Sequence, residues 1–195
     1  TELTPTSPEH GTSISSIVQA ILRPSPIRVL NMEKVSLGDH ELAELAQALP
    51  QSNIEELGIC GAYSMFGDEG LVALAKGLQG SKVNMLFMES YTYVWVNLGF
   101  VALAEALPRT QITDMYAPEI SIGPQGKEAL LRAFASVDCP TTNIVLHGVG
   151  DSELNRALRK RFRQQRALAL LRARLGPSPL RKVPEELARM IIGLQ

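Results

Sequence analysis

Apolar residues return along the chain in two alternating patterns, and the first is a short segment with apolar residues at its first, fourth and sixth positions. Such segments begin at Ile27, Ile54, Val83 and Ile112, so their spacing is nearly constant. The fourth and sixth positions have the two-residue spacing of side chains on one face of a β-strand. The sequence therefore predicts four short strands at a regular period.

The second pattern is an amphipathic stretch that follows each segment. These stretches run over 42–49, 71–78, 100–107 and 127–134. In the first three, apolar residues stand at i, i+3 and i+7 with alanines between them, which puts the apolar side chains on one face of a helix. Each unit is therefore predicted to be a strand, a loop and a helix.

The loops between strand and helix are also periodic. One apolar residue stands eight residues before a central leucine of each predicted helix, and these residues are Leu37, Phe66, Trp95 and Ile122. We interpret them as staples that pack on the helix start. Gly38-Asp39 and Gly67-Asp68 follow two of them and supply N-cap chemistry for the helix that begins there.

A strand of the form L-x-x-L-x-L followed by a helix, repeated at this nearly constant period, resembles the leucine-rich repeat in its long, ribonuclease-inhibitor-like form. The resemblance implies an α/β solenoid, here a horseshoe segment with its helices on the convex side. Four copies lie between Ile27 and Phe134, and a degenerate fifth runs from Ile144 to Leu158. The prediction is about four to five strand-loop-helix repeats with helical N- and C-terminal caps. An ordinary α/β layer of βαβ units is the alternative.

The domain boundaries follow from the repeat. We expect an N-terminal tail and capping helix in 1–26, the repeats in 27–150, a basic capping helix in 151–176, and a linker with a short terminal helix in 177–195. One departure from the family concerns the loops, which usually carry Asn or Cys three residues after the second strand leucine. This chain has Val35, Ala62, Tyr91 and Ile120 there, so the family's loop geometry cannot be carried over.

Strand side chains that do not enter the core would face outward on the concave side of such a solenoid. The outward positions hold four acidic residues and no base. Together with aromatic residues of the strands and ascending loops they form the predicted partner-binding set: Glu33, Glu56, Tyr63, Phe87, Glu89, Tyr91, Tyr93, Asp114 and Tyr116. Exposed aromatics supply contact area at a protein interface. The alternative is that the tyrosines pack loop against loop; for Phe66 and Trp95 we expect the core.

Composition and charge narrow the function classes. The 195 residues suit one domain, and 45% apolar with 20% charged residues is typical of a globular protein, which excludes a collagen or a disordered tail. No uncharged apolar run approaches the roughly 18 residues that a membrane span needs. The net charge of −1 is the sum of an acidic and a basic part of the chain. Residues 1–150 hold 8 Lys and Arg against 16 Asp and Glu, whereas residues 151–195 hold 11 Lys and Arg against 4 Asp and Glu.

The basic end, 151–195, offers two alternatives to the concave face as the functional region of the chain, and the first is its predicted basic helix. This helix, predicted within 151–176, includes Arg159, Lys160, Arg161, Arg163 and Arg166. We interpret it as a solvated basic cap, and the alternative is a tether to an anionic membrane or a nucleic acid.

The last dozen residues, from Pro184-Glu-Glu-Leu187 onward, resemble the opening helix of an F-box, which would imply a ubiquitin-ligase substrate adaptor. A short helix that folds back on the solenoid is the other interpretation.

No catalytic or metal-binding constellation is found in the sequence. His10, His40 and His147 are scattered, and Cys60 and Cys139 lack the paired spacing of a zinc site. The sequence therefore predicts a non-catalytic protein-protein interaction module with no cofactor and no small-molecule substrate, whose partner has a basic surface. Two cysteines favour a reducing compartment, cytoplasmic or reached by delivery into a host cytoplasm. The start at Thr1 suggests a trimmed chain.

Overall fold

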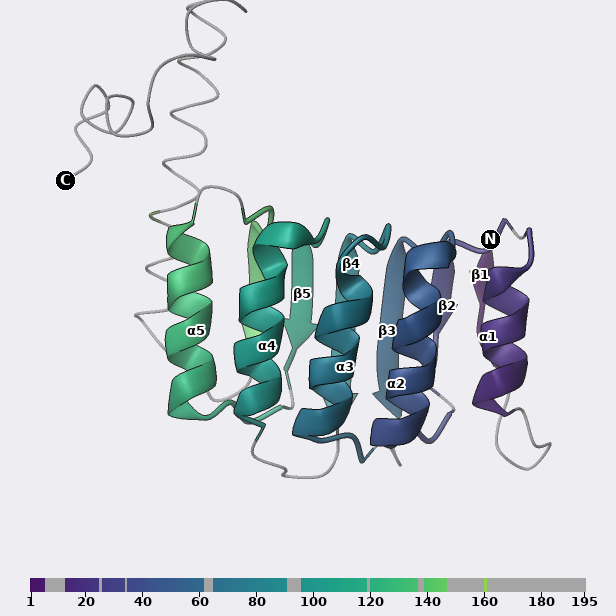
Figure 1. The fold of residues 1–195 in the computed structure, drawn as a ribbon, viewed down its shortest axis with the longest axis horizontal. Helices are drawn as coiled ribbons and strands as arrows, with labels where there is room; N and C mark the ends of the chain where they lie inside the picture. Colours follow the sequence, from purple (N-terminus) through teal and green to yellow (C-terminus); the bar gives the residue numbers. More distant parts are fainter. Residues whose placement is uncertain are drawn as a thin grey trace, which may run out of the picture.

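A computed structural model of the chain describes residues 1–5, 13–24, 26–33, 35–61, 65–90, 96–118, 120–136, 139–146 and 160. They form two layers, a sheet and a row of helices that covers one face of it (Figure 1). The strands are β1 (Glu2–Leu3), β2 (Val29–Asn31), β3 (Glu56–Gly61), β4 (Met85–Ser90), β5 (Asp114–Ala117) and β6 (Asn143–Leu146). The helices are α1 (Ile14–Leu22), α2 (Asp39–Ala48), α3 (Asp68–Leu78), α4 (Leu98–Ala106) and α5 (Pro124–Ala135), with 3-10 turns at Leu49–Gln51 and Leu107–Arg109.

The sheet has the order β1-β2-β3-β4-β5-β6, and every pair of neighbouring strands is parallel. Because each right-handed crossover returns to the adjacent strand in the same direction, every helix falls on the same side. The result is an α/β fold with the regular advance of a solenoid, in which no described helix covers the second face of the sheet (Figure 1). We call this second face the open face.

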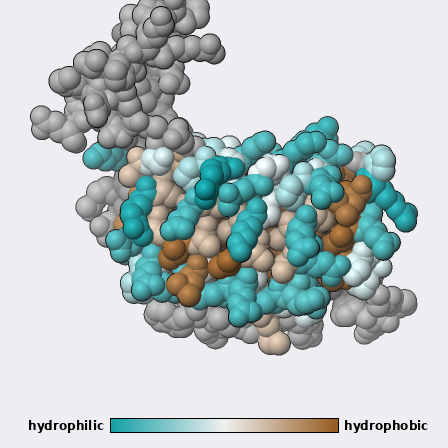
Figure 2. Space-filling model, viewed as in Figure 1, coloured by the Kyte–Doolittle hydropathy of each residue, from teal (hydrophilic) through white to brown (hydrophobic). Residues whose placement is uncertain are grey.

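The core lies between the two layers, and the positions predicted from the apolar pattern fill it. Leu30, Leu57 and Leu86 are fully buried, as are the helix leucines that pack on them. Phe66 is also buried, as expected for a staple. Figure 2 shows the outer side of the helix layer, which is largely hydrophilic with apolar patches over α1 and near the start of α4, where Leu98 is 59% exposed.

The two ends of the sheet differ from the sequence expectation. Residues assigned to an N-terminal tail include β1, which pairs with β2 through Glu2↔Val29 and Leu3↔Leu30. A strand of two residues is too short to show an apolar pattern. At the other end, β6 continues the register of the repeat through Asp114↔Asn143, so the fifth unit begins before Ile144.

Thr141 explains why the apolar pattern misses the start of the fifth unit. It follows Ile112 by the same interval by which Ile112 follows Val83, so it occupies a position where the earlier units carry Ile or Val, and it is fully buried. Its hydroxyl donates to the Ile112 carbonyl oxygen at 2.9 Å. The hydrogen bond lets a polar residue occupy an apolar position of the repeat.

The starts of α3, α4 and α5 are capped from the preceding unit, which corrects the expectation that Asp39 and Asp68 cap their own helices. The N-cap positions are Gly38 and Gly67. The Asp39 Oδ1 atom accepts hydrogen bonds from the backbone N–H of Gly67 at 2.6 Å and of Gly70 at 2.8 Å, both at the start of α3. One carboxylate therefore binds two of the N–H groups that the next helix leaves unpaired.

The same contact recurs one unit later. The Asp68 Oδ1 atom accepts from the N–H groups of Asn97 at 2.9 Å and Gly99 at 2.7 Å, at the start of α4. The Asn97 Oδ1 atom in turn accepts from the Gly126 N–H at 3.0 Å, in the first turn of α5. We call Asp39, Asp68 and Asn97 the cap ladder. Its three side chains tie each of these units to the next one along the chain.

Removing one rung of the ladder should destabilise the fold. We expect Asp68→Ala to lower the free energy of unfolding by about 1.5–3 kcal/mol, because two N–H groups lose a charged acceptor. Asp68→Asn replaces the carboxylate acceptor by an amide oxygen, the acceptor that Asn97 uses in the next unit, and should recover about half of the loss. Urea denaturation followed by circular dichroism measures this. The exposed neighbour Glu69→Ala is the control, and equal effects of Asp68→Ala and Glu69→Ala would contradict the ladder.

Close helix packing gives a second stability prediction. A Cβ atom on Gly77 would lie 2.1 Å from the Ala46 carbonyl oxygen of α2, whereas one on Gly58 in β3 would lie 3.4 Å from its nearest neighbour, Asn31 Oδ1. Helix propensity alone predicts that Gly77→Ala stabilises by about 1 kcal/mol. We expect it instead to destabilise by about 1–3 kcal/mol through overpacking. Gly58→Ala, the control, should be neutral or slightly stabilising in thermal unfolding.

Candidate protein-binding face

The register of the sheet arranges the side chains of the open face in rows that run across the strands. The first row is Glu2, Val29, Glu56, Met85, Asp114 and Asn143. The second row is Asn31, Gly58, Phe87, Tyr116 and Val145. A third row begins with Cys60 and Glu89, and Glu33 follows the end of β2 beside them. The predicted residues of the strands therefore share one surface, and β1 adds a fifth acidic residue, Glu2.

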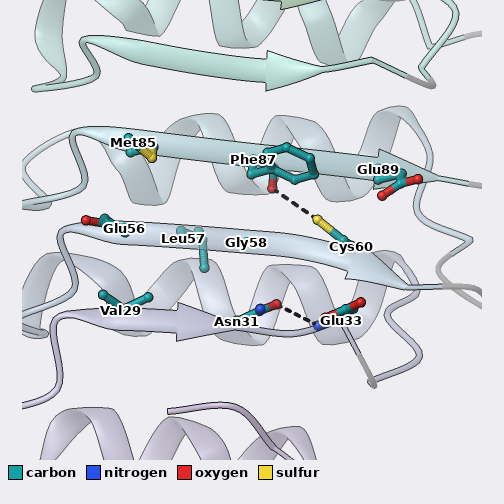
Figure 3. Close-up of a pocket in the computed structure, with 10 residues that line it drawn as sticks. All are labelled: Val29, Asn31, Glu33, Glu56, Leu57, Gly58, Cys60, Met85, Phe87 and Glu89. Carbon is teal, nitrogen blue, oxygen red and sulfur yellow. Dashed lines mark hydrogen bonds between the residues drawn. The ribbon is translucent and has the colours of Figure 1, made fainter. Parts of the chain in front are cut away.

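A pocket of about 360 Å³ opens on this face over β2, β3 and β4 (Figure 3). Its lining residues are Val29, Asn31, Glu33, Glu56, Leu57, Gly58, Cys60, Met85, Phe87 and Glu89. Adjacent strands are about 4.8 Å apart, so Asn31 and Phe87 stand roughly 10 Å apart across Gly58, which has no side chain to fill the interval. We call this hollow the Gly58 pocket.

The electrostatic character of the pocket is acidic. Glu33, Glu56 and Glu89 line it, and the described positions of the three rows include no Lys, Arg or His. Arg28, next to the first row, is paired with Glu55 in an ion pair. The three pocket carboxylates form no ion pair with any residue of the described ranges. Their charge is therefore uncompensated there and available to a cation.

Cys60 lines the pocket at the end where Glu33 and Glu89 lie (Figure 3). Its side chain is only 8% exposed, and its Sγ atom lies 4.0 Å from the Phe87 carbonyl oxygen (Figure 3). Burial, with a smaller contribution from the charges of Glu89 and Glu33, raises the pKa of the Cys60 thiol from 9.0 to about 12. The group is therefore a neutral thiol and an unsuitable nucleophile.

The aromatic part of the face is held in place by side-chain contacts. The rings of Phe87 and Tyr116 are stacked, with centroids 6.0 Å apart and an interplanar angle of 26°. The Asn143 amide donates to the Tyr116 hydroxyl oxygen at 2.7 Å and to Asp114 Oδ1 at 3.2 Å. The Thr113 hydroxyl donates to Asp114 Oδ2 at 2.7 Å. Asp114 is thus committed to intramolecular bonds, unlike the pocket carboxylates.

Sequence reasoning did not identify Asn143 or Gly58 as members of the site. The signal for Asn143 is its position one repeat after Asp114, because the interval between them equals that between Met85 and Asp114. The remaining predicted residues Tyr63, Tyr91 and Tyr93, and the staple Trp95, lie outside the described residues. In the basic end, Lys160 is exposed, whereas Arg159, Arg161, Arg163 and Arg166 and the terminal segment 177–195 also lie outside the described part of the chain.

The described residues also bear on metal binding and membrane insertion. Among the residues that the structure describes, no group of three or more His, Cys, Asp or Glu side chains is arranged to hold a metal ion. Within the same residues, no helix has both the length and the apolar character of a membrane span.

Comparisons with known proteins support the fold. No protein-family model matches the chain, and no curated protein matches it. Among solved structures, it is similar to one described as leiomodin-1 actin-binding site 2, with a TM-score of 0.57 and 15% sequence identity. The similarity covers 83% of this chain and 94% of that chain. At this identity the similarity shows the shared α/β architecture alone.

The Cys60 environment yields a chemical prediction. A pKa of about 12 lowers the thiolate fraction at pH 8 about a thousandfold relative to an ordinary thiol. We expect iodoacetamide to alkylate Cys60 in the folded chain at least about a hundredfold more slowly than in urea-unfolded chain, as read by peptide mass spectrometry.

Removing a nearby negative charge lowers the pKa of the thiol, so Glu89→Gln should speed this alkylation at pH 8. Glu56 lines the same pocket, but its charge is not among those that raise the pKa of the Cys60 thiol. Glu56→Gln therefore serves as the control. Equal alkylation rates in folded and unfolded chain would refute the assignment.

Proposed function

We propose that this chain is a leucine-rich repeat protein that binds another protein through the open face, without catalysis. The observation that carries the proposal is the stacked pair of Phe87 and Tyr116 beside an acidic pocket on a sheet face that no described helix covers. Phe87 is 36% exposed although it is a large aromatic residue. Aromatic anchors of this kind supply most of the energy at protein interfaces.

The rigidity of the face supports a binding role. Its side chains project from six hydrogen-bonded strands, and Asn143 fixes both Tyr116 and Asp114. A preformed surface loses little conformational entropy when a partner binds. The similar solved structure is itself described as an actin-binding site, so a related fold serves protein recognition elsewhere. We assign no such partner to this chain.

The charge of the face favours a partner with a basic surface. Glu2, Glu33, Glu56 and Glu89 give it a negative potential that accelerates the encounter with a positive one. Both cysteines are free thiols, as is usual for a protein of a reducing compartment, and we include a cytoplasmic location in the proposal.

The basic end supports a second candidate function, in which it tethers the chain to an anionic membrane or a nucleic acid. The observation in its favour is eight Lys and Arg residues between Arg156 and Arg174. Arg159→Glu, Arg161→Glu and Arg163→Glu together should abolish sedimentation with anionic vesicles under this candidate. Under the first proposal they leave binding of the partner protein unchanged.

The test of the first proposal is affinity capture with two matched variants. We expect Phe87→Ala with Tyr116→Ala to lower the affinity for the captured protein at least about a hundredfold, because both rings leave the interface. Leu98→Ala is the control, since Leu98 is a large exposed apolar residue of the helix layer.

The captured protein is identified by mass spectrometry, and its affinity for each variant is measured by calorimetry. Equal affinity of the ring variant and the Leu98 variant would show that the open face is inert.

A further inference from the structure

The Gly58 pocket is the feature of the open face that restricts its partner most. Its volume of about 360 Å³ lies near the lower end of the range of about 300–1,000 Å³ for ligand pockets. A single long side chain fits a space of this size, whereas a helix or strand of the partner does not enter it.

The apolar side chains at the pocket suit the hydrocarbon part of such a side chain. Val29 and Met85 lie toward one end of it (Figure 3). In the second row Phe87 stands between Gly58 and Tyr116, so the side of its ring away from Tyr116 borders the pocket. An aromatic ring at the wall attracts a cation as well as an apolar stem.

Carboxylates lie at both ends of the pocket along the strands. Glu56 precedes Gly58 by two residues, while Glu33 and Glu89 lie at the opposite end beside Cys60 (Figure 3). The raised pKa of the Cys60 thiol has both Glu89 and Glu33 among its causes, after burial, so their charge acts on the pocket interior. A cation in the pocket would therefore have negative charge on two sides.

We propose that the Gly58 pocket receives one basic side chain of the partner protein, with arginine preferred over lysine. A guanidinium group is planar, so it can stack on the Phe87 ring while it forms hydrogen bonds with carboxylates at the edges. The inference rests on the proposed protein-binding function and names the chemistry of the contact.

The fold does not require the absence of a side chain at residue 58. The backbone there has no positive φ, and an added Cβ would meet its nearest atom, Asn31 Oδ1, at 3.4 Å. A Cβ atom can therefore be added at this position without a clash or backbone strain. Gly58→Leu would fill the space that the basic side chain occupies.

A displayed library of random peptides provides the probe. We expect peptides selected on the intact protein to share one Arg or Lys, and a synthetic copy is titrated by fluorescence anisotropy. Replacement of that residue by citrulline, which keeps the shape but not the charge, should weaken binding about tenfold or more. Gly58→Leu should weaken it to a similar extent, and Gly58→Ala less.

Charge variants check the assignment independently of the pocket shape. Glu56→Gln should weaken the Arg peptide and leave the citrulline peptide unchanged. Asp114→Asn is the matched control, because Asp114 lies on the same face outside the pocket and is bonded to Thr113 and Asn143. Circular dichroism confirms that each variant folds, and if Gly58→Leu does not, the Glu56 and citrulline comparison decides.

Several results would overturn the inference. One is a citrulline peptide that binds the intact protein as tightly as the selected peptide does. Another is a Gly58→Leu variant that binds the selected peptide as tightly as the intact protein does. The third is a selection in which no peptide is sensitive to Gly58→Leu. The chain's own basic segment is the competing occupant. Neutralising it by Arg159→Gln, Arg161→Gln and Arg163→Gln should leave the peptide affinity unchanged, and a higher affinity would assign the pocket to that segment instead.

The outcome also separates this inference from the proposed function. If peptide binding is lost in Phe87→Ala with Tyr116→Ala but not in Gly58→Leu, the open face binds protein and the pocket assignment fails. If peptide binding is insensitive to both variants, the face has no role and both proposals fail.

Discussion

The starts of α3, α4 and α5 each depend on a side-chain oxygen from the unit before, and this dependence ties neighbouring units of the repeat together. Asp39 and Asp68 each bind two N–H groups at the start of the following helix, so α2 is tied to α3 and α3 is tied to α4. Gly99 lets the helices approach, because a Cβ there would lie 2.5 Å from Leu71 Cβ. In α5 the first helical position is Pro124, which has no side-chain acceptor, and the ladder of the described units ends there.

A constant relation between units places equivalent residues beside one another on the open face. From β3 to β6, each strand residue pairs with the residue one repeat further along the chain. Residues at equivalent positions of neighbouring units therefore lie side by side on adjacent strands. The stacked Phe87 and Tyr116 arise in this way. Gly58 stands in the same row, and its missing side chain becomes a pocket because its neighbours on both sides are held in register.

Periodicity made the strands, the helices and the outward positions predictable, because burial repeats wherever the same face of an element meets the core. The features that sequence reasoning missed depend on contacts between units. A carboxylate such as Asp39 looks like a local cap until the next helix is seen to supply the N–H groups. Thr141 breaks the apolar pattern, yet a hydrogen bond to the preceding unit satisfies it. Gly58 has no pattern to distinguish it, since a pocket is a property of its neighbours.

Gly58 also shows that the fold does not dictate the residue type at this position of the open face. Within a strand, glycine costs about 0.5–1 kcal/mol relative to alanine, and neither backbone conformation nor crowding calls for it here. Gly77 is different, because its Cβ would overlap the Ala46 backbone. The helix-side glycine is therefore explained by packing, whereas the sheet-side glycine is explained only by the space above it. Because the core lies on the other side of the sheet, the cost of this space to the repeat is limited to that of a glycine within a strand.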